Sequence, residues 1–272
     1  MTDCCVSSLH CAEKVKMKTV KQLYGYLDNK IPRELSCSWD NDGMMVCATP
    51  DKRCERVLLT LDITNQAVDY AIDNGFSLIV SHHPLIFKKL SGVCAGEFVC
   101  DKIIKLVQSG VSACSFHTRL DALQGGVNDA LAKKLGLVNT ELFGTDEELI
   151  GRMGELDDPV CFEELLPAIK ESLGATQITY VKGKDTVKKI CLVGGDGKDF
   201  LKSALSAGAD LYVTGSMSYN SMLDASDMGI SVVEAGHYES EVPVLEALDK
   251  MIKEFDEGIY TEFFSSNPIK TL

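Results

Sequence analysis

Short aliphatic runs alternate with stretches of helical periodicity along most of this chain. Residues 56–63, 76–81 and 111–116 are apolar runs of strand length, and a helical pattern separates each from the next. Gly75 and Gly110 close two of these helical stretches, as is typical of helix C-termini. Parallel strands require crossover connections, so the alternation predicts an α/β fold in which mainly parallel sheets are covered by helices.

The same rhythm indicates two lobes. It loosens over 144–158, where glycine and acidic residues are concentrated, and a second series of strands and helices follows. We therefore expect a two-lobed protomer, with 17–124 and 230–272 in the first lobe and 125–229 in the second, preceded by a flexible extension at 1–16. The expected strands are 43–47, 56–63, 76–81, 111–116, 176–181, 189–193, 210–214 and 230–234, and the expected helices include 19–29, 97–109, 127–135, 159–173, 198–207, 219–227 and 241–255.

The charge balance argues against several classes of partner. The 272 residues contain 27 Lys and Arg against 40 Asp and Glu, a formal charge of −13 with no local basic patch. Such a field repels nucleic-acid backbones and anionic membranes. The N-terminus has no basic segment followed by an apolar one, and no stretch approaches the ~18 apolar residues of a membrane span. We expect a cytoplasmic protein with neither a membrane nor a nucleic acid as partner.

The cysteines do not form a recognisable metal or disulfide framework. There are eleven, an odd number, and no C-x-x-C pair occurs. Most lie within apolar runs, which favours reduced thiols acting as small hydrophobic side chains over structural zinc. Cys4, Cys5 and Cys11 are exceptions because they lie in a polar leader, and Met17 is a candidate for the functional start.

Polar clusters follow three of the predicted strands. His82 and His83 come at the end of 76–81, His117 and Asp121 follow 111–116, and His237 and Glu241 follow 230–234. Open α/β sheets place their ligand sites at the carboxyl ends of strands, and four of the five histidines fall there. This coincidence predicts one site at strand ends between the lobes, built from residues assigned to the first lobe. Ser240 is expected to cap the helix that begins near Glu241.

Imidazole and carboxylate donors together indicate a mixed nitrogen and oxygen site for Zn, Fe, Mn, Co or Ni. In extended chain the neighbouring His82 and His83 point apart, so each could serve one of two ions. The whole set is too large for a single ion and suits two divalent ions about 3.5–4 Å apart. We expect His117 to orient Asp121 rather than to bind metal itself. A histidine pair at a strand end without metal is the plainer alternative.

Three strings resemble the signatures of the NIF-three-like family, often labelled GTP cyclohydrolase I type 2 homologues: Ser81-His-His-Pro-Leu-Ile-Phe87, His117-Thr-Arg-Leu-Asp-Ala122 and Gly236-His-Tyr-Glu-Ser-Glu241. The resemblance extends over nearly the whole chain from Met17. It implies two metal ions held by His82, His83, Asp121, His237 and Glu241. It also implies a toroidal homohexamer, here in the short form that lacks an inserted domain.

One segment departs from the family pattern. Relatives often carry an Asp and a His where this chain has Ser216 and Asn220. If those groups move protons in the relatives, this protein lacks a general acid or base near the metals while keeping its ligands. Metal binding is therefore predicted more firmly than catalysis.

Other residues could line the same pocket. The glycine-rich segment 193–199 could cradle a phosphate, although a tight turn between strand and helix is favoured. Asp62 could line the pocket, but a cap for the next helix is favoured. Asn41 could face the pocket or lie in an ordinary turn, and the sequence favours neither.

The motifs favour water over a side chain as nucleophile. No G-x-S-x-G elbow occurs, and no cysteine is marked as reactive by its neighbours. We expect a metal-dependent hydrolase in which metal-activated water attacks a small molecule, with a nucleotide such as GTP as one candidate. The alternative is a noncatalytic metal-binding, metal-delivery or partner-binding hexameric scaffold. Nucleic-acid binding in the channel of a toroid ranks last because of the −13 charge.

Overall fold

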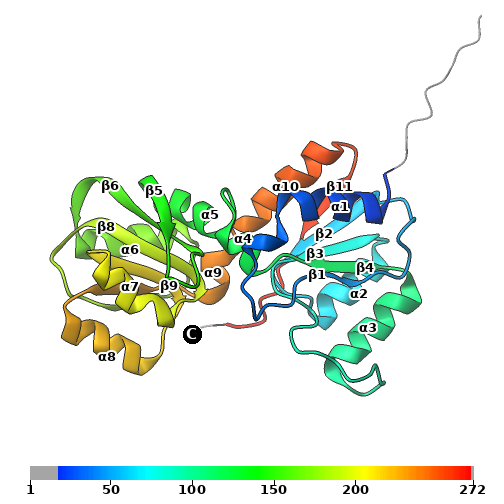
Figure 1. Cartoon of the computed structure of the whole chain (residues 1–272), viewed down its shortest axis with the longest axis horizontal. Helices are drawn as coiled ribbons and strands as arrows, with labels where there is room; N and C mark the ends of the chain where they lie inside the picture. Colours follow the sequence, from blue (N-terminus) through cyan, green and yellow to red (C-terminus); the bar gives the residue numbers. More distant parts are fainter. Residues whose placement is uncertain (1–17, 271–272) are drawn as a thin grey trace, which may run out of the picture.

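The computed structural model describes residues 18–270, and the cysteine-bearing leader lies outside this part of the chain. Two sheets, each with its own helices, form two lobes that lie side by side (Figure 1). Parallel strands occupy the centre of each sheet, and the antiparallel pairings lie toward the margins. The predicted α/β fold with two helix-covered lobes is confirmed.

The first sheet has the order β1-β4-β3-β2-β11. Its strands are β1 (Gly43–Val46), β2 (Arg56–Thr60), β3 (Leu78–Ser81), β4 (Ser112–Ser115) and β11 (Tyr260–Phe263). Alternate residues of a strand face opposite sides, and here both sides are apolar. Val57 and Leu59 pack on the face covered by α1 (Val20–Lys30) and α10 (Val244–Phe255), whereas Leu58 packs on the face covered by α2 (Asn65–Asp73) and α3 (Phe98–Ser109).

The second sheet has the order β5-β6-β8-β9-β10-β7. One face packs against α5 (Val127–Lys134) and α6 (Phe162–Ser172), and the other against α7 (Leu201–Ser206) and α8 (Tyr219–Met228). The strands are β5 (Val138–Phe143), β6 (Gly151–Cys161), β7 (Thr179–Val181), β8 (Thr186–Asp196), β9 (Leu211–Ser216) and β10 (Ser231–Glu234).

Two single-turn helices, α4 (Thr118–Ala122) and α9 (His237–Glu241), lie between the lobes (Figure 1). The predicted helix 241–255 is divided into α9 and α10, with Pro243 as the N-cap of α10. Proline has no N–H to donate, so it fits the start of a new helix better than the interior of a continuous one. Ser240 caps neither helix, contrary to expectation: Gly236 precedes α9, and the Ser240 hydroxyl binds the backbone of Gly195 and His237.

The predicted division of the chain differs from the sheet membership at one strand. Residues 230–234 were expected in the first lobe, but β10 pairs in parallel with β9 of the second sheet. The connection from β9 through α8 is a short crossover, which keeps successive strands adjacent. Only α10 and β11 then return to the first sheet, where β11 pairs with β2. The ligand candidates on α9 therefore stand at the end of a second-sheet strand.

The structure also bears on the expectations about membrane spans and cysteines. Within residues 18–270 no helix combines the length and the apolar character needed to cross a membrane. The cysteines of the same range are all free thiols, and Cys54, Cys100, Cys114 and Cys191 are buried, as expected for small hydrophobic side chains.

Candidate metal centre

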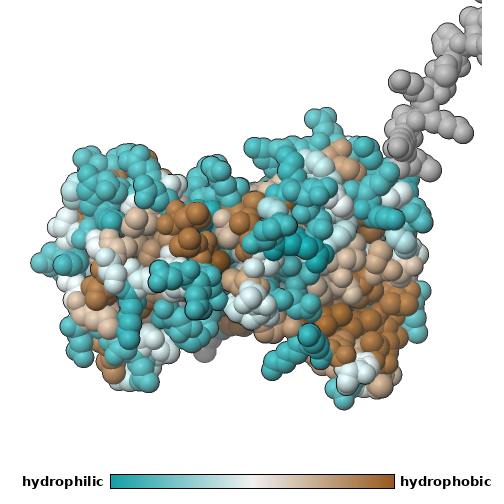
Figure 2. Space-filling view, in the orientation of Figure 1, coloured by the Kyte–Doolittle hydropathy of each residue, from teal (hydrophilic) through white to brown (hydrophobic). Residues whose placement is uncertain are grey.

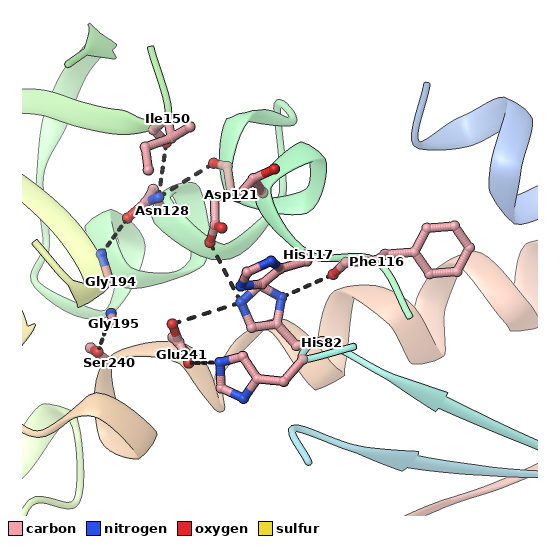
Figure 3. Close-up of polar contacts among 12 residues, drawn as sticks. His82, Phe116, His117, Asp121, Asn128, Ile150, Gly194, Gly195, Ser240 and Glu241 are labelled. Atoms are coloured by element: carbon pink, nitrogen blue, oxygen red, sulfur yellow. Dashed lines mark hydrogen bonds and ion pairs between the residues drawn. The ribbon is translucent and has the colours of Figure 1, made fainter. Parts of the chain in front are cut away.

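Four elements bring the predicted residues to one place. β3 and β4 are parallel neighbours, so His82 and His117, which follow them, emerge at the same edge of the first sheet. Asp121 lies on α4, and Glu241 lies on α9 of the second lobe. Figure 3 shows these four side chains pointing toward one another across the junction between the lobes. The strand ends of two sheets thus meet at a single cluster.

Two imidazoles are held by oxygen acceptors behind them. The Nδ1–H of His82 donates to the Phe116 carbonyl at 2.9 Å, and that of His117 donates to the Asp40 carboxylate at 2.8 Å. Because each acceptor is an oxygen, the proton is assigned to Nδ1 and the Nε2 lone pair is free. Burial lowers the pKa of the fully buried His82, which keeps this ring neutral. Neutral imidazoles oriented by a hydrogen bond at the far nitrogen are typical of metal ligands.

His83 is held by carboxylates on both sides. Its Nδ1 lies 2.8 Å from Asp62 Oδ1, and its Nε2 lies 3.1 Å from Glu241 Oε2. Burial lowers the pKa of His83, but the hydrogen bond to Asp62 and the close negative charge of the Glu241 carboxylate outweigh it and raise the value to about 10. The two carboxylates therefore favour positive charge at this position. Either a proton on the ring or a cation beside it would balance the negative charge of these two carboxylates.

The Glu241 carboxylate lies at the centre of the cluster. Its Oε1 is 3.7 Å from His82 Nε2, while its Oε2 is 3.1 Å from His83 Nε2 and 3.4 Å from His237 Nε2. The two oxygens of one side chain thus face different imidazoles. Two overlapping groups of donor atoms could each hold an ion, and both include His83: His82, His83 and His117 in one, and His83, His237 and Glu241 in the other.

Asp121 adds a second buried carboxylate. Its Oδ1 lies 3.7 Å from His82 Nε2, and burial and the negative charge of Glu241 raise the pKa of Asp121 well above its usual value. Burial also raises the pKa of Glu241, but the neighbouring His82 and His83 outweigh it and hold that pKa low. The positive charge of the neighbouring histidines is thus enough to keep only one of the two acids, Glu241, ionised. A divalent cation between them would stabilise both ionised forms.

Unpartnered buried atoms test whether a cation fits. Within the described chain, His82 Nε2, Asp121 Oδ1 and Glu241 Oε2 are buried without a hydrogen-bond partner. The short Glu241–His83 and Glu241–His237 separations are contacts and not hydrogen bonds by geometry. Buried polar atoms are rarely left unpaired, because each costs about 1–3 kcal/mol. Two acceptors and an imidazole lone pair gathered in this way fit a bound divalent ion.

Two backbone N–H groups of β8 bind side chains of α9 and α5 beside this cluster. The Gly195 N–H donates to Ser240 Oγ at 3.0 Å, and the Gly194 N–H donates to Asn128 Oδ1 at 2.8 Å (Figure 3). Gly195 has φ +68°, and a Cβ there would overlap Glu241 Oε1. Since both N–H groups are already bonded, the favoured interpretation of 193–199 as a tight turn fits the structure better than a phosphate cradle.

The sequence of this chain is similar to one protein family over nearly its whole length. A family model described as Duf34/NIF3 (NGG1p interacting factor 3) matches residues 18–270. The chain belongs to the DUF34/NIF3 family. A protein of Clostridium perfringens named GTP cyclohydrolase 1 type 2 homolog is 34% identical over 240 residues, which cover 86% of this chain and 91% of the relative. A Helicobacter pylori protein named GTP cyclohydrolase 1 type 2 is 30% identical and aligns over 94% of this chain and 100% of the relative.

Solved structures of NIF3-related proteins share the fold. A hypothetical protein of Staphylococcus aureus, SA1388, superposes with a TM-score of 0.84 at 26% identity and covers 93% of this chain and 99% of its own. A Bacillus cereus protein related to NIF3 gives a TM-score of 0.85 at 21% identity, with 94% and 100% covered. Both solved structures thus share the fold of this chain over almost its whole length.

The structure brings the five predicted ligands together. His82, His83, Asp121, His237 and Glu241 all have a donor atom within 3.7 Å of another member of the set. The rings of His82 and His83 lie 4.9 Å apart and belong to one group of donors, so they do not point apart as an extended strand would require. The chain has already left β3 at Ser81, which frees both rings to turn inward.

The role predicted for His117 needs correction. No hydrogen bond joins it to Asp121 in the described chain; its Nδ1 binds Asp40 instead, and its ring lies 5.3 Å from that of His82. Together with His82 and His83 it forms one of the two donor groups. Its geometry is therefore that of a further candidate ligand.

The other predicted pocket residues divide into two kinds. Asp62 is not the cap of α2, since Thr64 is; Asp62 instead holds His83. Ser216 Oγ lies 3.4 Å from His237 Nδ1, so it does adjoin the cluster. Asn41 donates to the Ile86 carbonyl in an exposed loop, and Asn220 lies on the exposed first turn of α8; neither is placed against the donors by any described contact.

Sequence reasoning missed two residues behind the imidazoles. Asp40 binds His117, and Ser266 donates to Asp62 Oδ2 at 3.2 Å and accepts from the Asp62 N–H at 3.2 Å. The polar string Trp39-Asp-Asn-Asp-Gly43 did not single out Asp40, because Asp, Asn and Gly are ordinary residues of a turn. Ser266 follows β11 and carries no signal in the sequence either.

Proposed function

We propose that this protein holds two divalent metal ions and is a metal-dependent hydrolase of a small molecule. The observation that carries the proposal is the position of Glu241, whose two oxygens face different imidazoles, so that one carboxylate could help to hold two ions. His82, His83, Asp121, His237 and Glu241 are the proposed ligands, and His117 is a sixth donor. Such ions, when bound, polarise a substrate oxygen and lower the pKa of water, which is hydrolytic chemistry.

The chain's own residues prepare the site for that chemistry. The Phe116 carbonyl, Asp62 and Asp40 hold three imidazoles with Nε2 toward the centre, so little reorganisation accompanies binding. Asp121 and Glu241 supply negative charge in a buried setting, where attraction for a cation is strongest. A purine nucleotide is one candidate substrate, because relatives carry the name GTP cyclohydrolase 1 type 2.

A metal-delivery or scaffold role is the second candidate, and Ser216 supports it. Its hydroxyl lies beside His237, at the segment where the family resemblance implies an acid, and a hydroxyl cannot serve as a general base near neutral pH. With Asn220 on an exposed helix, the described chain offers no replacement at this position.

Metal analysis combined with turnover distinguishes these functions. We expect about two ions per chain in protein purified without chelator, measured by mass spectrometry, and a loss of metal in Asp121→Asn and Glu241→Gln. Glu239→Gln on the same short helix is the matched control, since Glu239 belongs to neither donor group. Metal-dependent hydrolysis of a substrate panel that disappears with the ligands supports the enzyme. Full metal loading without any turnover supports the carrier, and wild-type protein that takes up none of Zn, Mn, Fe, Co or Ni contradicts both.

We also propose the homohexamer that the family resemblance implies. An apolar patch lies over α3 in Figure 2, where Phe98 is 70% exposed and Val107 52% exposed. Exposed apolar patches of this kind are typical of association surfaces. Light scattering should give a mass near six protomers, and Phe98→Glu should lower it if this patch lies in an interface; Tyr219→Glu, at another exposed aromatic side chain, is the control.

A further inference from the structure

A cavity of about 580 Å³ opens beside the candidate ligands, at the junction between the lobes. His83, His117, Asp121, His237 and Glu241 form one wall. Its volume lies in the range of sites for small organic molecules. The remaining walls therefore indicate what kind of molecule would meet the metals.

Two large aromatic side chains form the wall next to His117. Trp39 is 53% exposed and Phe87 is 49% exposed, although both line the cavity. Their rings meet edge to face at 6.1 Å, and each lies 6.2 Å from the ring of His117. Half-exposed aromatic faces beside a reactive centre offer a stacking surface for another planar ring.

A hydrogen bond across the lobes fixes the orientation of the indole. The Nε1–H of Trp39 donates to Glu148 Oε1 at 2.7 Å, and Glu148 belongs to the segment that precedes β6 of the second sheet. The ring is thus held at its edge, while about half of the side chain stays exposed where it lines the cavity. A fixed ring loses little conformational entropy when a ligand stacks on it.

The charges around the cavity argue against a highly anionic ligand. Five carboxylates line it, and Lys198 is the one lysine or arginine among the described lining residues; the carboxylates are Asp121, Glu148, Asp196, Asp199 and Glu241. The ammonium of Lys198 lies 2.5 Å from Asp196 and is already paired. Two divalent ions would about neutralise these groups and would leave no net positive field for a triphosphate.

We propose that this cavity binds an uncharged, planar heteroaromatic ring of the nucleobase or nucleoside class, stacked on Trp39 beside Phe87, and that it disfavours polyphosphate forms of the same ring. The inference rests on the proposed function, since it names the substrate class of the same metal site. A polar edge of the ring would face the candidate metal ligands, and the aromatic wall supplies the stacking.

The chain carries its own reporter for this binding, because Trp39 is its single tryptophan. Metal-loaded wild-type protein should be titrated with guanosine and with GTP, which differ only in the triphosphate, while tryptophan emission is excited where purines absorb little. We expect saturable quenching by guanosine and an affinity for guanosine at least tenfold higher than for GTP. Tighter binding of GTP, or no binding of guanosine, overturns the proposal.

Variants separate stacking from folding. By calorimetry, Trp39→Leu should bind guanosine roughly tenfold more weakly, as expected when a stacked base loses its aromatic partner. Trp39→Phe, which keeps a ring, should lose less, and Tyr219→Leu, at an exposed aromatic away from the cavity, should lose nothing. Equal guanosine affinity in wild type and a folded Trp39→Leu overturns the proposal.

The outcome is separable from that of the proposed function. Guanosine binding that depends on Trp39 without any turnover supports the cavity's ligand class and contradicts the hydrolase. Metal-dependent turnover that is unchanged in Trp39→Leu supports the hydrolase and contradicts the stacking site.

Discussion

The imidazole of His117 and the carboxylate of Asp40 lie 2.8 Å apart, Nδ1 to Oδ1, although 77 positions separate them in the chain. Asp40 also accepts from the Thr118 N–H and hydroxyl. Burial raises the pKa of Asp40, but the hydrogen bonds from His117 and Thr118 outweigh it and lower the value to about 2. Asp40 therefore stays ionised at working pH and holds His117 with its Nε2 toward His82.

Asp40→Asn should weaken metal binding. The amide keeps the size of the side chain but removes the negative charge that holds His117 in its orientation. Loss of such a partner typically costs 10- to 100-fold in metal affinity, and we expect the lower end because an amide oxygen can still accept. Competition with a chelator measures the change, with the exposed Asp51→Asn as control. Unchanged affinity in Asp40→Asn would remove His117 from the ligand set.

Gly195→Ala should disrupt the cluster, whereas Gly75→Ala should not. Both glycines have φ +68°, so alanine costs each about 1–2 kcal/mol of backbone strain. At Gly75 the new methyl group meets nothing within 4 Å, but at Gly195 it overlaps Glu241 Oε1. Both variants should unfold at lower denaturant concentration, and only Gly195→Ala should lose metal. Equal metal content in the two variants would contradict the close packing of this turn against α9.

Asp28→Asn should lower stability in a pH-dependent way. Arg119 is fully buried, and its NH1 donates to Asp28 Oδ1 at 2.9 Å. Burial raises the pKa of Asp28, but the hydrogen bonds from Arg119 and Tyr24 outweigh it and hold the pKa below its ordinary 3.8. A depressed carboxyl pKa gives stability that is present above pH 3.8 and is lost as the pH falls further.

We expect Asp28→Asn to cost about 1–3 kcal/mol at pH 7. Urea unfolding at a series of pH values should show this difference from wild type shrinking as the pH falls below 4. The exposed Asp224→Asn should match wild type throughout. A difference that stays constant down to pH 3 would show that the charge of Asp28 is not responsible.

Ser266→Ala should loosen His83. Ser266 is buried and binds both the N–H and the carboxylate of Asp62, which in turn holds His83 Nδ1. Without the hydroxyl, Asp62 can turn away, and we expect metal affinity to fall by less than tenfold because Asp62 itself is retained. Ser265 is its exposed neighbour, so Ser265→Ala is the matched control. Titration with a chelator compares the metal affinity of the two variants. Identical titration curves would mean that Asp62 needs no support from the C-terminal segment.

The candidate ligands could be predicted because their position follows from a general rule. His82 and His117 end parallel strands that are neighbours, so their meeting needs no knowledge of side-chain contacts. The hydrogen bond of His117 to Asp40 could not be predicted in this way, because it depends on the path of the loop that carries Asp40. Asn220 fails for a similar reason: a helical pattern at α8 does not say how that helix is turned relative to the cluster.

The missed hairpin of β5 and β6 has a different cause. β5 lies at the edge of its sheet with five of its six residues exposed, so it shows no apolar run. The segment after it was predicted as a loosened boundary between lobes, whereas the chain there forms the turn into β6. Buried strands can be recognised in a sequence by their apolar residues, whereas exposed edge strands lack this pattern.

The donors come from both sheets: His83 follows β3, while His237, 154 positions later in the chain, follows β10. An ion shared by them would cross-link two separately packed cores. Depletion of the metal would then leave each core intact but weaken their union, and the segment between β5 and β6 at the junction would become easier for a protease to reach. Metal supply would in this way set the lifetime of the protein.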